Sequence, residues 1–409
     1  MERDAGHIDG GGAVMTTVWD DLVGQADVVA TLKRAVDASH SGAGHAMTHA
    51  WLFTGPPGSG RSNAARAFAA ALQCPRHGCG QCTDCRTALS GAHPDVKLVR
   101  TEKLSIGVDE VRDLVRDASM SPMGGRYQII VVEDADRVTD RGADALLKAI
   151  EEPSPRTVWI LCAPNPDEVV VTIRSRTRHL ALATPTDQAV ADLLVRRDGV
   201  DVVMATYAAR AAQGHIGRAR ALARDESARD RRRRVLEIPG QLTSIGACLT
   251  AAENLVKASA DEAAAATAEI DVKETAALSE ALGVGTKGAR PKNAAAALKA
   301  LEDQQKARAK RLQRDSLDRV LTELTTWYRD VLGVQTGALG LDLPSETGGG
   351  PHLINAEQSQ QVARAARGSS PEQTLRRIDA ILATREALEQ NVTPLIAMES
   401  LMVSLADPR

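Results

Sequence analysis

The segment HAWLFTGPPGSGRS, from His49 to Ser62, determines how the rest of the sequence is interpreted. It begins with a short apolar run that ends at Gly55, which predicts a buried strand leading into a loop. The spacing of Ala64, Phe68 and Leu72 predicts a helix directly after that loop. A glycine-rich loop between a strand and a helix wraps backbone N–H groups around a phosphate, and the helix N-terminus adds partial positive charge. The segment therefore predicts an α/β P-loop module.

The loop differs from the usual phosphate-binding pattern at one position. That pattern, G-x-x-x-x-G-K-[ST], has a lysine before the last hydroxyl residue, and here Arg61 precedes Ser62. Arginine is longer, planar and forked, so it does not replace a compact lysine conservatively in a tight cradle. Because phosphoryl transfer depends on that lysine, the loop argues for the fold and against hydrolysis. Two alternatives stay open: the loop binds ATP or ADP passively, or it is kept only for packing.

An acidic pair follows the next long apolar run. The segment YQIIVVEDAD predicts a buried strand that ends at Glu133 and Asp134. ATPases with such loops carry Asp and then Glu at this point, to organise Mg²⁺ and to position water. The two acids are swapped here, so each carboxylate reaches a different depth; solvated acids at a strand end are the simpler alternative. Together the two segments predict a degenerate nucleotide site formed by Gly55, Gly58, Gly60, Arg61, Ser62, Glu133 and Asp134.

Strands and helices alternate up to about Pro185, and the pattern beyond it is helical. Apolar runs in VKLVR, TVWILCA and HLALA predict further strands of a mostly parallel sheet flanked by helices. Farther along, apolar stripes predict two long helices, one with Leu317, Leu321, Leu324, Tyr328 and Val331, and one with Leu375, Ile378, Leu382, Arg385 and Leu388. The expected organisation is a disordered tail (1–17), an α/β domain (18–185), a helical lid (186–236) and a helical collar (237–409) with a flexible insert around 258–300 and a long loop at 337–371.

Four of the six cysteines lie close together in the sequence. Cys74, Cys79, Cys82 and Cys85 form a C-x4-C-x2-C-x2-C pattern. Such spacing lets successive thiolates point at one ion, and four sulfurs close a tetrahedral Zn²⁺ shell, which predicts a structural zinc module at 74–85. Redox-active cysteine pairs are the alternative that this pattern disfavours. His77 is a substitute ligand to consider, although a surface histidine without a metal role explains it equally simply.

Two arginine-rich segments carry a weaker signal. TIRSRTR, from Thr172 to Arg178, lies between the last two predicted strands. An arginine at the rim of such a sheet can reach the nucleotide of a neighbouring subunit and neutralise charge on its γ-phosphate. A basic turn is usually only solvated, and the run from Arg231 to Arg234 is likewise interpreted as a solvated helix face rather than a DNA phosphate contact.

Composition limits the class of protein. The net charge is −3, so nucleic-acid contact requires a local patch rather than a field of the whole molecule. Aromatic residues make up only 2% of the chain, so its cores must be mainly aliphatic. No apolar run approaches the ~18 residues of a membrane span, and the N-terminus lacks the pattern of a signal peptide, so a cytoplasmic protein without membrane contact is expected.

These motifs together resemble the clamp-loader subunits of bacterial DNA polymerase III, which are AAA+ proteins. In that family Gly24-Gln25 after VWDDLV, the HAWLFTGPPGSGRS loop, the four cysteines, IIVVEDAD, ALLKAIEEP and IRSRT occur in the same order. The resemblance covers roughly 18–223, and LEQNVTPLIAMESL is loosely similar to the last collar segment of the family.

The resemblance also indicates a type of subunit. The ATPase subunits of the family, gamma/tau, keep the loop lysine, the Asp-Glu order and an arginine in a G-x-x-R element of the lid. This chain has Gly217 at that last position, with Arg218 one residue later, whereas the Ser-Arg-Cys motif of the family persists as Ser175-Arg176-Thr177. That combination resembles delta prime, the subunit type that does not hydrolyse ATP and supplies an arginine finger, here Arg176.

The resemblance implies partners and cofactors. Delta prime joins gamma/tau and delta subunits in a hetero-pentameric ring that opens the sliding beta clamp and places it on primed DNA. The implied cofactor is a structural Zn²⁺, and any ATP or ADP bound by the chain itself would not be hydrolysed. Two other readings stay open at this point, namely a gamma/tau-type ATPase that tolerates Arg61 and a catalytically idle member of the ring.

Overall fold

The structure is a computed structural model of the chain that describes residues 17–42, 46–101, 105–282, 294–340, 352–390 and 392–406. These residues form two compact units, one ending at Arg220 and the other beginning at Ala221. The tail expected at the N-terminus lies outside the described residues except for Thr17. Among the described helices, none combines the length and the apolar character that a bilayer span requires.

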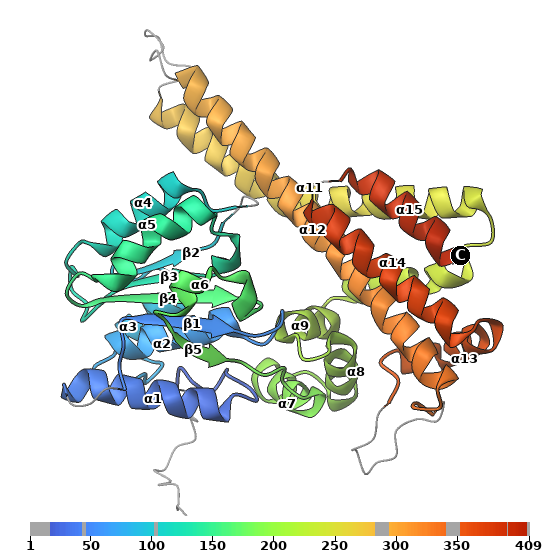
Figure 1. Cartoon of the computed structure of the whole chain (residues 1–409), viewed down its shortest axis with the longest axis horizontal. Coiled ribbons are helices and arrows are strands. Elements are labelled where there is room, and N and C mark those ends of the chain that lie inside the picture. Colours follow the sequence, from blue (N-terminus) through green and yellow to red (C-terminus); the bar gives the residue numbers. More distant parts are fainter. Residues whose placement is uncertain are drawn as a thin grey trace, which may run out of the picture. The chain divides into compact units, whose positions relative to one another are not determined.

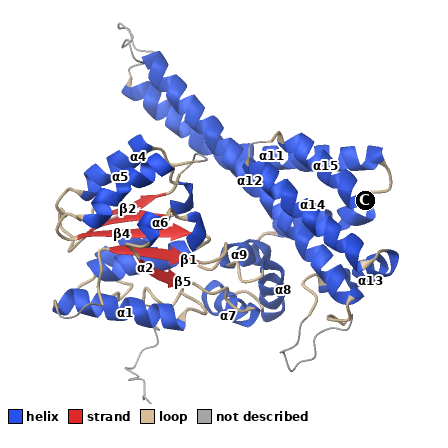
Figure 2. Cartoon of the chain, viewed as in Figure 1, coloured by secondary structure: helices blue, strands red, loops and turns tan. Residues whose placement is uncertain are grey.

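The first unit is built on a five-stranded sheet of order β2-β3-β4-β1-β5 (Figures 1 and 2). All four pairings are parallel, and β1 runs beside β4 with Ala50 opposite Trp159. The parallel sheet predicted from the alternating pattern is therefore confirmed. The strands are β1 (Ala50–Thr54), β2 (Val96–Val99), β3 (Gln128–Val132), β4 (Thr157–Ala163) and β5 (Arg178–Ala181).

Helices cover both faces of this sheet. Trp51 and Phe53 of β1 face a core that includes α1 and α2, and Ala50 and Leu52 face the opposite core with α4, α5 and α6. Alternate residues of one buried strand thus serve two cores, as expected for a strand covered on both faces. The helices of this sandwich are α1 (Ala26–Ser41), α2 (Arg61–Gln73), α3 (Thr83–Ser90), α4 (Val108–Ala118), α5 (Asp140–Glu151) and α6 (Val171–Arg174).

Three aromatic residues form a cluster on the strand and helix that flank the glycine-rich loop. The chain has two phenylalanines, Phe53 and Phe68, and both pack near Trp51. The rings of Trp51 and Phe68 meet edge to face with centroids 5.0 Å apart, and the Arg178 guanidinium lies 5.0 Å from the Trp51 ring. This cluster supports both the strand that enters the loop and the helix that leaves it.

The rest of the first unit is helical. Thr186 caps α7 (Asp187–Asp198), and Asp201 caps α8 (Val202–Ala212) through backbone N–H groups of the first turn. The division between the two units falls inside α9 (Ile216–Arg224), ahead of the boundary at residue 236 that the sequence suggested.

The second unit is wholly helical among its described residues. Its core contains the predicted stripe of α12, because Leu317, Leu321, Leu324, Tyr328 and Val331 are all buried. The elements are α10 (Glu226–Glu237), α11 (Ile245–Ala281), α12 (Ala294–Gln335), α13 (Ser359–Gly368), α14 (Pro371–Glu389) and α15 (Pro394–Ala406). The described residues of both units also contain four short 3₁₀ turns, at Ala135–Arg137, Pro166–Glu168, Ile238–Gly240 and Ala356–Gln358.

The segment expected as a flexible insert is mostly helix. Residues 258–281 continue α11, and 294–300 begin α12, while the GVGTKGARPK interruption falls outside the described residues. Alanine has the highest helix propensity, so a low-complexity Ala-rich stretch favours helix over coil. The two helices lie side by side and antiparallel, with Arg308 donating to Glu274 at 3.0 Å (Figure 1).

Two details of the C-terminal region differ from the sequence expectation. Within the segment expected as one long loop, residues 359–368 form α13. In α14, Leu375 and Leu382 of the predicted stripe are exposed, and Thr374, Ile381 and Thr384 are buried instead. Threonines can occupy the buried face because their hydroxyls are satisfied locally, as that of Thr384 is by the Ala380 carbonyl at 2.8 Å.

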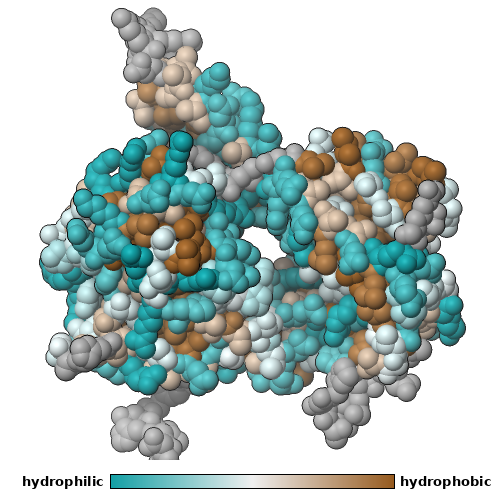
Figure 3. All heavy atoms as spheres, in the orientation of Figure 1, coloured by the Kyte–Doolittle hydropathy of each residue, from teal (hydrophilic) through white to brown (hydrophobic). Residues whose placement is uncertain are grey.

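One residue of the arginine run is buried, which corrects the expectation of a solvated face. Arg232 is 3% exposed, and its Nε donates to Glu323 Oε2 at 3.1 Å. Its other nitrogens bond to Asn355 and Glu357. Arg231, Arg233 and Arg234 are exposed, as expected. Figure 3 shows hydrophilic residues over much of the visible face, interrupted by smaller apolar areas.

Candidate functional site

The glycine-rich loop has the backbone of a phosphate cradle. It connects β1 to α2, and Gly58 and Gly60 adopt left-handed φ values of 88° and 91°, which glycine reaches without steric cost. A side chain at Gly58 is also excluded by space, since a Cβ there would lie 2.5 Å from the Cα of His215. The segment that begins α9 therefore lies directly against the loop. The sequence analysis had assigned no role to His215.

Arg61 turns its side chain back onto its own loop. Its Nη1 donates to the Gly55 carbonyl, so the guanidinium is bound within the cradle. Burial lowers the pKa of Arg61, and the nearby Cys162 thiol and the carboxylates of Asp136 and Asp134 act in the opposite direction. The pKa of an arginine is high enough that the group keeps its charge in proteins. The side chain that replaces the phosphate-binding lysine is thus held as a cation by the chain's own carbonyl.

The two acids at the end of β3 are also bound by the chain itself. Glu133 Oε1 accepts from Arg66 Nε at 3.2 Å and from Arg66 Nη2 at 2.8 Å, and the Glu133 side chain is 8% exposed. Asp134 Oδ2 accepts from the Thr101 backbone N–H at 3.2 Å. Arg66 was missed by the sequence analysis because an arginine within α2 gives no sign of a partner at the end of β3.

Gln25 ties the loop to the segment that follows the sheet. Its Nε2 donates to the Ser59 carbonyl at 3.2 Å and to the Ala183 carbonyl at 2.6 Å, and its Oε1 accepts from the Ala183 N–H at 3.2 Å. The side chain is 4% exposed, so these bonds are shielded from water. The loop is therefore held from one side by Gln25 and approached from the other by His215.

These contacts show how far the site suits a nucleotide. The glycine conformations and the start of α2 fit a phosphate group. The side chains fit hydrolysis poorly, because Arg61 is bonded to Gly55 and Glu133 is paired with Arg66. A magnesium ion and a γ-phosphate would have to displace both interactions.

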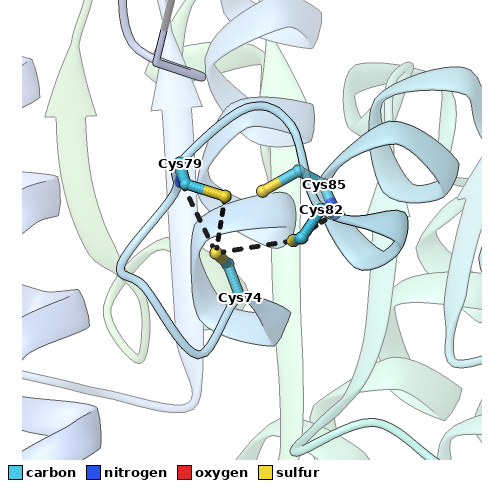
Figure 4. A group of neighbouring side chains, drawn as sticks. All are labelled: Cys74, Cys79, Cys82 and Cys85. Atoms are coloured by element: carbon cyan, nitrogen blue, oxygen red, sulfur yellow. Dashed lines mark hydrogen bonds between the residues drawn. The ribbon is translucent and has the colours of Figure 1, made fainter. Parts of the chain in front are cut away.

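The four cysteines converge on one point (Figure 4). Their sulfurs all lie within 4.8 Å of one another, and Cys74 Sγ is 3.6 Å from both Cys79 Sγ and Cys82 Sγ. Four ligands at ~2.3 Å from a tetrahedral ion have sulfurs about 3.8 Å apart, so this donor set fits Zn²⁺. Among the described residues, this is the only group of metal-binding side chains so arranged.

Local backbone geometry brings the cysteines together. Cys74 ends α2, and Cys82 caps α3 by accepting the Cys85 N–H at 3.4 Å. Although burial acts to raise it, hydrogen bonds from the backbone N–H groups of Gln81 and Cys82 lower the pKa of Cys79 to about 6. A thiol that ionises this readily is a suitable metal ligand, because the metal binds the thiolate.

His77 lies beside the cysteines but is bound elsewhere. Its Nδ1 lies 2.6 Å from Asp37 Oδ1, and its ring stacks on His40 with centroids 4.1 Å apart. His40 Nε2 in turn lies 3.0 Å from the carbonyl oxygen of Cys74. His77 has a φ of 56°, which is unusual for a residue with a side chain. The structure thus groups four sulfurs without His77 and ties His77 to α1.

Arg176 follows α6 and is partly exposed, with 41% of its side chain accessible to solvent. Its Nε lies 2.5 Å from Glu151 Oε1 at the end of α5. Its Nη1 donates to the Thr172 carbonyl at 3.0 Å and to Ser175 Oγ at 3.2 Å. Gly217 and Arg218, the two residues compared above with the arginine of the G-x-x-R element, both lie in the first turn of α9. The pairing with Glu151 was not anticipated from the sequence.

Comparisons with known proteins concern the first unit. The model of a family described as "DNA polymerase III, delta subunit" matches residues 25–186. This region of the chain is therefore similar to clamp-loader subunits of DNA polymerase III. The matched range includes the phosphate loop, the four cysteines, the acidic pair and Arg176.

Relatives of two subunit types match the same region. DNA polymerase III subunit delta′ of Escherichia coli is 32% identical over 196 residues, covering 46% of this chain and 58% of its own length. The delta′ subunit of Pseudomonas aeruginosa is 36% identical over 154 residues, covering 36% and 47%. Subunit gamma/tau of Mycobacterium tuberculosis H37Rv is 35% identical over 195 residues, covering 46% and 33%. The chain thus spans between a third and three fifths of these relatives, and identity does not separate the two types.

Proposed function

We propose that the chain acts as a delta-prime-type subunit of a DNA polymerase III clamp loader, without hydrolysing ATP itself. In this role it joins gamma/tau and delta subunits in a ring of five and helps to load the sliding beta clamp onto primed DNA in the cytoplasm. The observation that carries the proposal is the bond from Arg61 to the Gly55 carbonyl of its own loop. The residue at the position of the phosphate-binding lysine is engaged within the cradle instead.

The acidic pair supports the same conclusion. Hydrolysis requires carboxylates that are free to hold Mg²⁺ and orient water. Glu133 is instead neutralised by Arg66 at 2.8 Å in a largely buried position. Release of Glu133 would leave Arg66 without its partner, and a buried carboxylate would then have to be solvated or bound by metal. The loop and the acids are therefore both adapted to contacts within the chain.

Arg176 supports a role in a neighbouring site. It lies outside the Arg61 cradle, and its guanidinium is accessible. An arginine supplied in trans stabilises the charge that develops on a transferring γ-phosphate. We assign this role to Arg176, acting on an adjacent gamma/tau subunit.

The cysteine module has a structural role in this proposal. Cys74, Cys79, Cys82 and Cys85 would hold one Zn²⁺ in a shell of four sulfurs, which leaves no position open for a substrate. They extend from the end of α2 at Cys74 to Cys85 in the first turn of α3, so a bound metal would fix the end of α2. The chemistry that the metal supplies is thus stabilisation of the fold.

A reconstituted clamp loader tests the arginine finger. With Arg176→Ala in this subunit, hydrolysis at the adjacent ATPase site should fall by on the order of 10³-fold. Total ATPase activity stimulated by clamp and primed DNA should therefore fall below the wild-type level while other sites keep working. Arg174→Ala is the matched control, because Arg174 lies on the same turn and pairs with Asp167. Wild-type activity with Arg176→Ala would favour the idle ring member instead.

A further inference from the structure

The guanidinium of Arg176 is held at two of its three nitrogens. Nε pairs with Glu151 Oε1 at 2.5 Å, and Nη1 donates to the Thr172 carbonyl and Ser175 Oγ. Within the described part of the chain, Nη2 has no hydrogen-bond partner. Two nitrogens of the planar group are thereby engaged from different directions, while Nη2 is left to donate elsewhere.

Glu151 is placed by a rigid support. It is the last residue of α5, and Ile150 before it is 1% exposed in the core beneath the sheet. The Ile150 carbonyl lies 2.7 Å from His49 Nε2, just ahead of β1. On the other side of the pair, Ile173 of α6 is 2% exposed and packs in the same core. Both partners of the ion pair are thus attached to one packed layer.

We propose that Glu151 is the positioning residue of Arg176, setting the direction in which its free nitrogen points. This inference rests on the arginine-finger role proposed above. An arginine side chain has several rotatable bonds, so an unrestrained finger must be ordered at each encounter with the phosphate. A carboxylate fixed at the end of α5 orders it beforehand. The pair is exposed and contributes little to stability, so its effect should be on geometry.

The opposite role for Glu151 would be inhibitory: its carboxylate would compete with the phosphate for Arg176. We call this role a latch. A latch would occupy the donors that the phosphate needs. The observed contacts instead engage Nε and Nη1 and leave Nη2 available, which favours positioning. The two roles predict opposite signs for the effect of removing Glu151 on neighbouring hydrolysis.

The first experiment measures clamp- and DNA-stimulated ATPase in the reconstituted loader. Glu151→Ala should lower kcat. The loss should be roughly half or more of the loss that Arg176→Ala causes, and KM for ATP should stay unchanged. Glu151→Gln should recover most of the activity, because its amide oxygen can still accept from Arg176 Nε. Glu152→Ala is the matched control, since Glu152 is exposed, adjacent, and not bonded to Arg176.

The second experiment reads the geometry directly in the isolated full chain. Labelling with ¹⁵N-arginine makes the Nε–H groups visible, and the Arg176→Lys variant identifies the signal of Arg176. Its exchange with solvent should be several-fold faster in Glu151→Ala than in wild type or Glu152→Ala, because the Nε–H loses the neighbouring carboxylate that limits its contact with water.

The outcomes separate the inference from the function on which it rests. Wild-type ATPase activity with Arg176→Ala overturns both. Reduced activity with Arg176→Ala but wild-type activity with Glu151→Ala overturns only the positioning role. Increased activity with Glu151→Ala also overturns it, because that result identifies a latch.

Discussion

Arg66 and Glu133 form a two-nitrogen contact, with Nε at 3.2 Å and Nη2 at 2.8 Å from the same carboxylate oxygen. The pair links α2, which follows the phosphate loop, to the end of β3, where Glu133 and Asp134 lie. It therefore connects the loop and the acidic pair of the predicted nucleotide site through an ion pair.

Restoring the loop lysine alone should not restore hydrolysis. In Arg61→Lys the compact ammonium can reach a phosphate, but Glu133 stays paired with Arg66 and the two acids stay swapped. ATP turnover by the isolated Arg61→Lys chain should therefore stay at the background level of wild type. A variant that turned over ATP steadily would show that Arg61 is the only defect.

Removal of Arg66 should destabilise the first unit. Arg66→Ala leaves the largely buried Glu133 carboxylate without its cation, at a cost of about 1–3 kcal/mol in free energy of unfolding. Chemical denaturation measures this change. Arg112→Ala is the control, because Arg112 pairs with Asp109 in a highly exposed setting and should cost well under about 1 kcal/mol. Equal effects of the two substitutions would contradict the importance of the Arg66 pair.

The histidine that supports the cysteine module should control metal release. Freshly purified chain should contain one zinc, and His77→Ala should weaken zinc binding by about 10–100-fold, because the turn loses its attachment to Asp37. Competition with a coloured chelator measures the zinc dissociation constant. Arg76→Ala, an exposed neighbour in the same turn, should bind zinc as wild type does. Well under one zinc per wild-type chain would instead refute the metal site.

Asp95 should make the first unit sensitive to acid. Although burial acts to raise it, hydrogen bonds from the N–H groups of Met123, Gly124 and Gly125 lower the pKa of Asp95 below its usual value. The carboxylate therefore contributes stability above the unfolded pKa of about 3.9, and this contribution is lost as pH falls through the lower folded pKa.

Asp95→Asn tests this contribution. The variant should be less stable than wild type by about 1–3 kcal/mol at pH 7, and the difference should shrink below about pH 4. Urea unfolding at a series of pH values gives both quantities. A difference that is independent of pH would mean that the charge of Asp95 is not involved.

Local patterns predicted the sheet because its three central strands, β3, β4 and β1, are short and largely apolar runs. The cysteine cluster was equally predictable from the sequence, since its four cysteines lie close together in the chain. The pairs Arg66–Glu133 and Glu151–Arg176 were not predicted, because each joins residues that become neighbours only when separate elements of the fold pack. No spacing within one segment specifies such a contact.

Burial on the helices was the least predictable feature. Arg232 belongs to a run of four arginines, and only packing against α12 distinguishes it from its exposed neighbours. In α14 the exposed Leu375 and buried Thr374 reverse what hydrophobicity alone suggests. Hydroxyls that bond within their own helix remove the cost of burying threonine, so the apolar stripe predicted the buried face only in part: Leu388 is buried, whereas Leu375 and Leu382 are exposed.

Steady-state ATP turnover by the isolated full chain tests the central claim most directly. The assay uses saturating ATP and Mg²⁺, with and without clamp and primed DNA, and Ser62→Ala serves as the control for contaminating ATPase. We predict background turnover that is the same for wild type and Ser62→Ala, because Arg61 and Glu133 are bound within the chain. Turnover above background that Ser62→Ala abolishes would contradict the account and identify a gamma/tau-type ATPase.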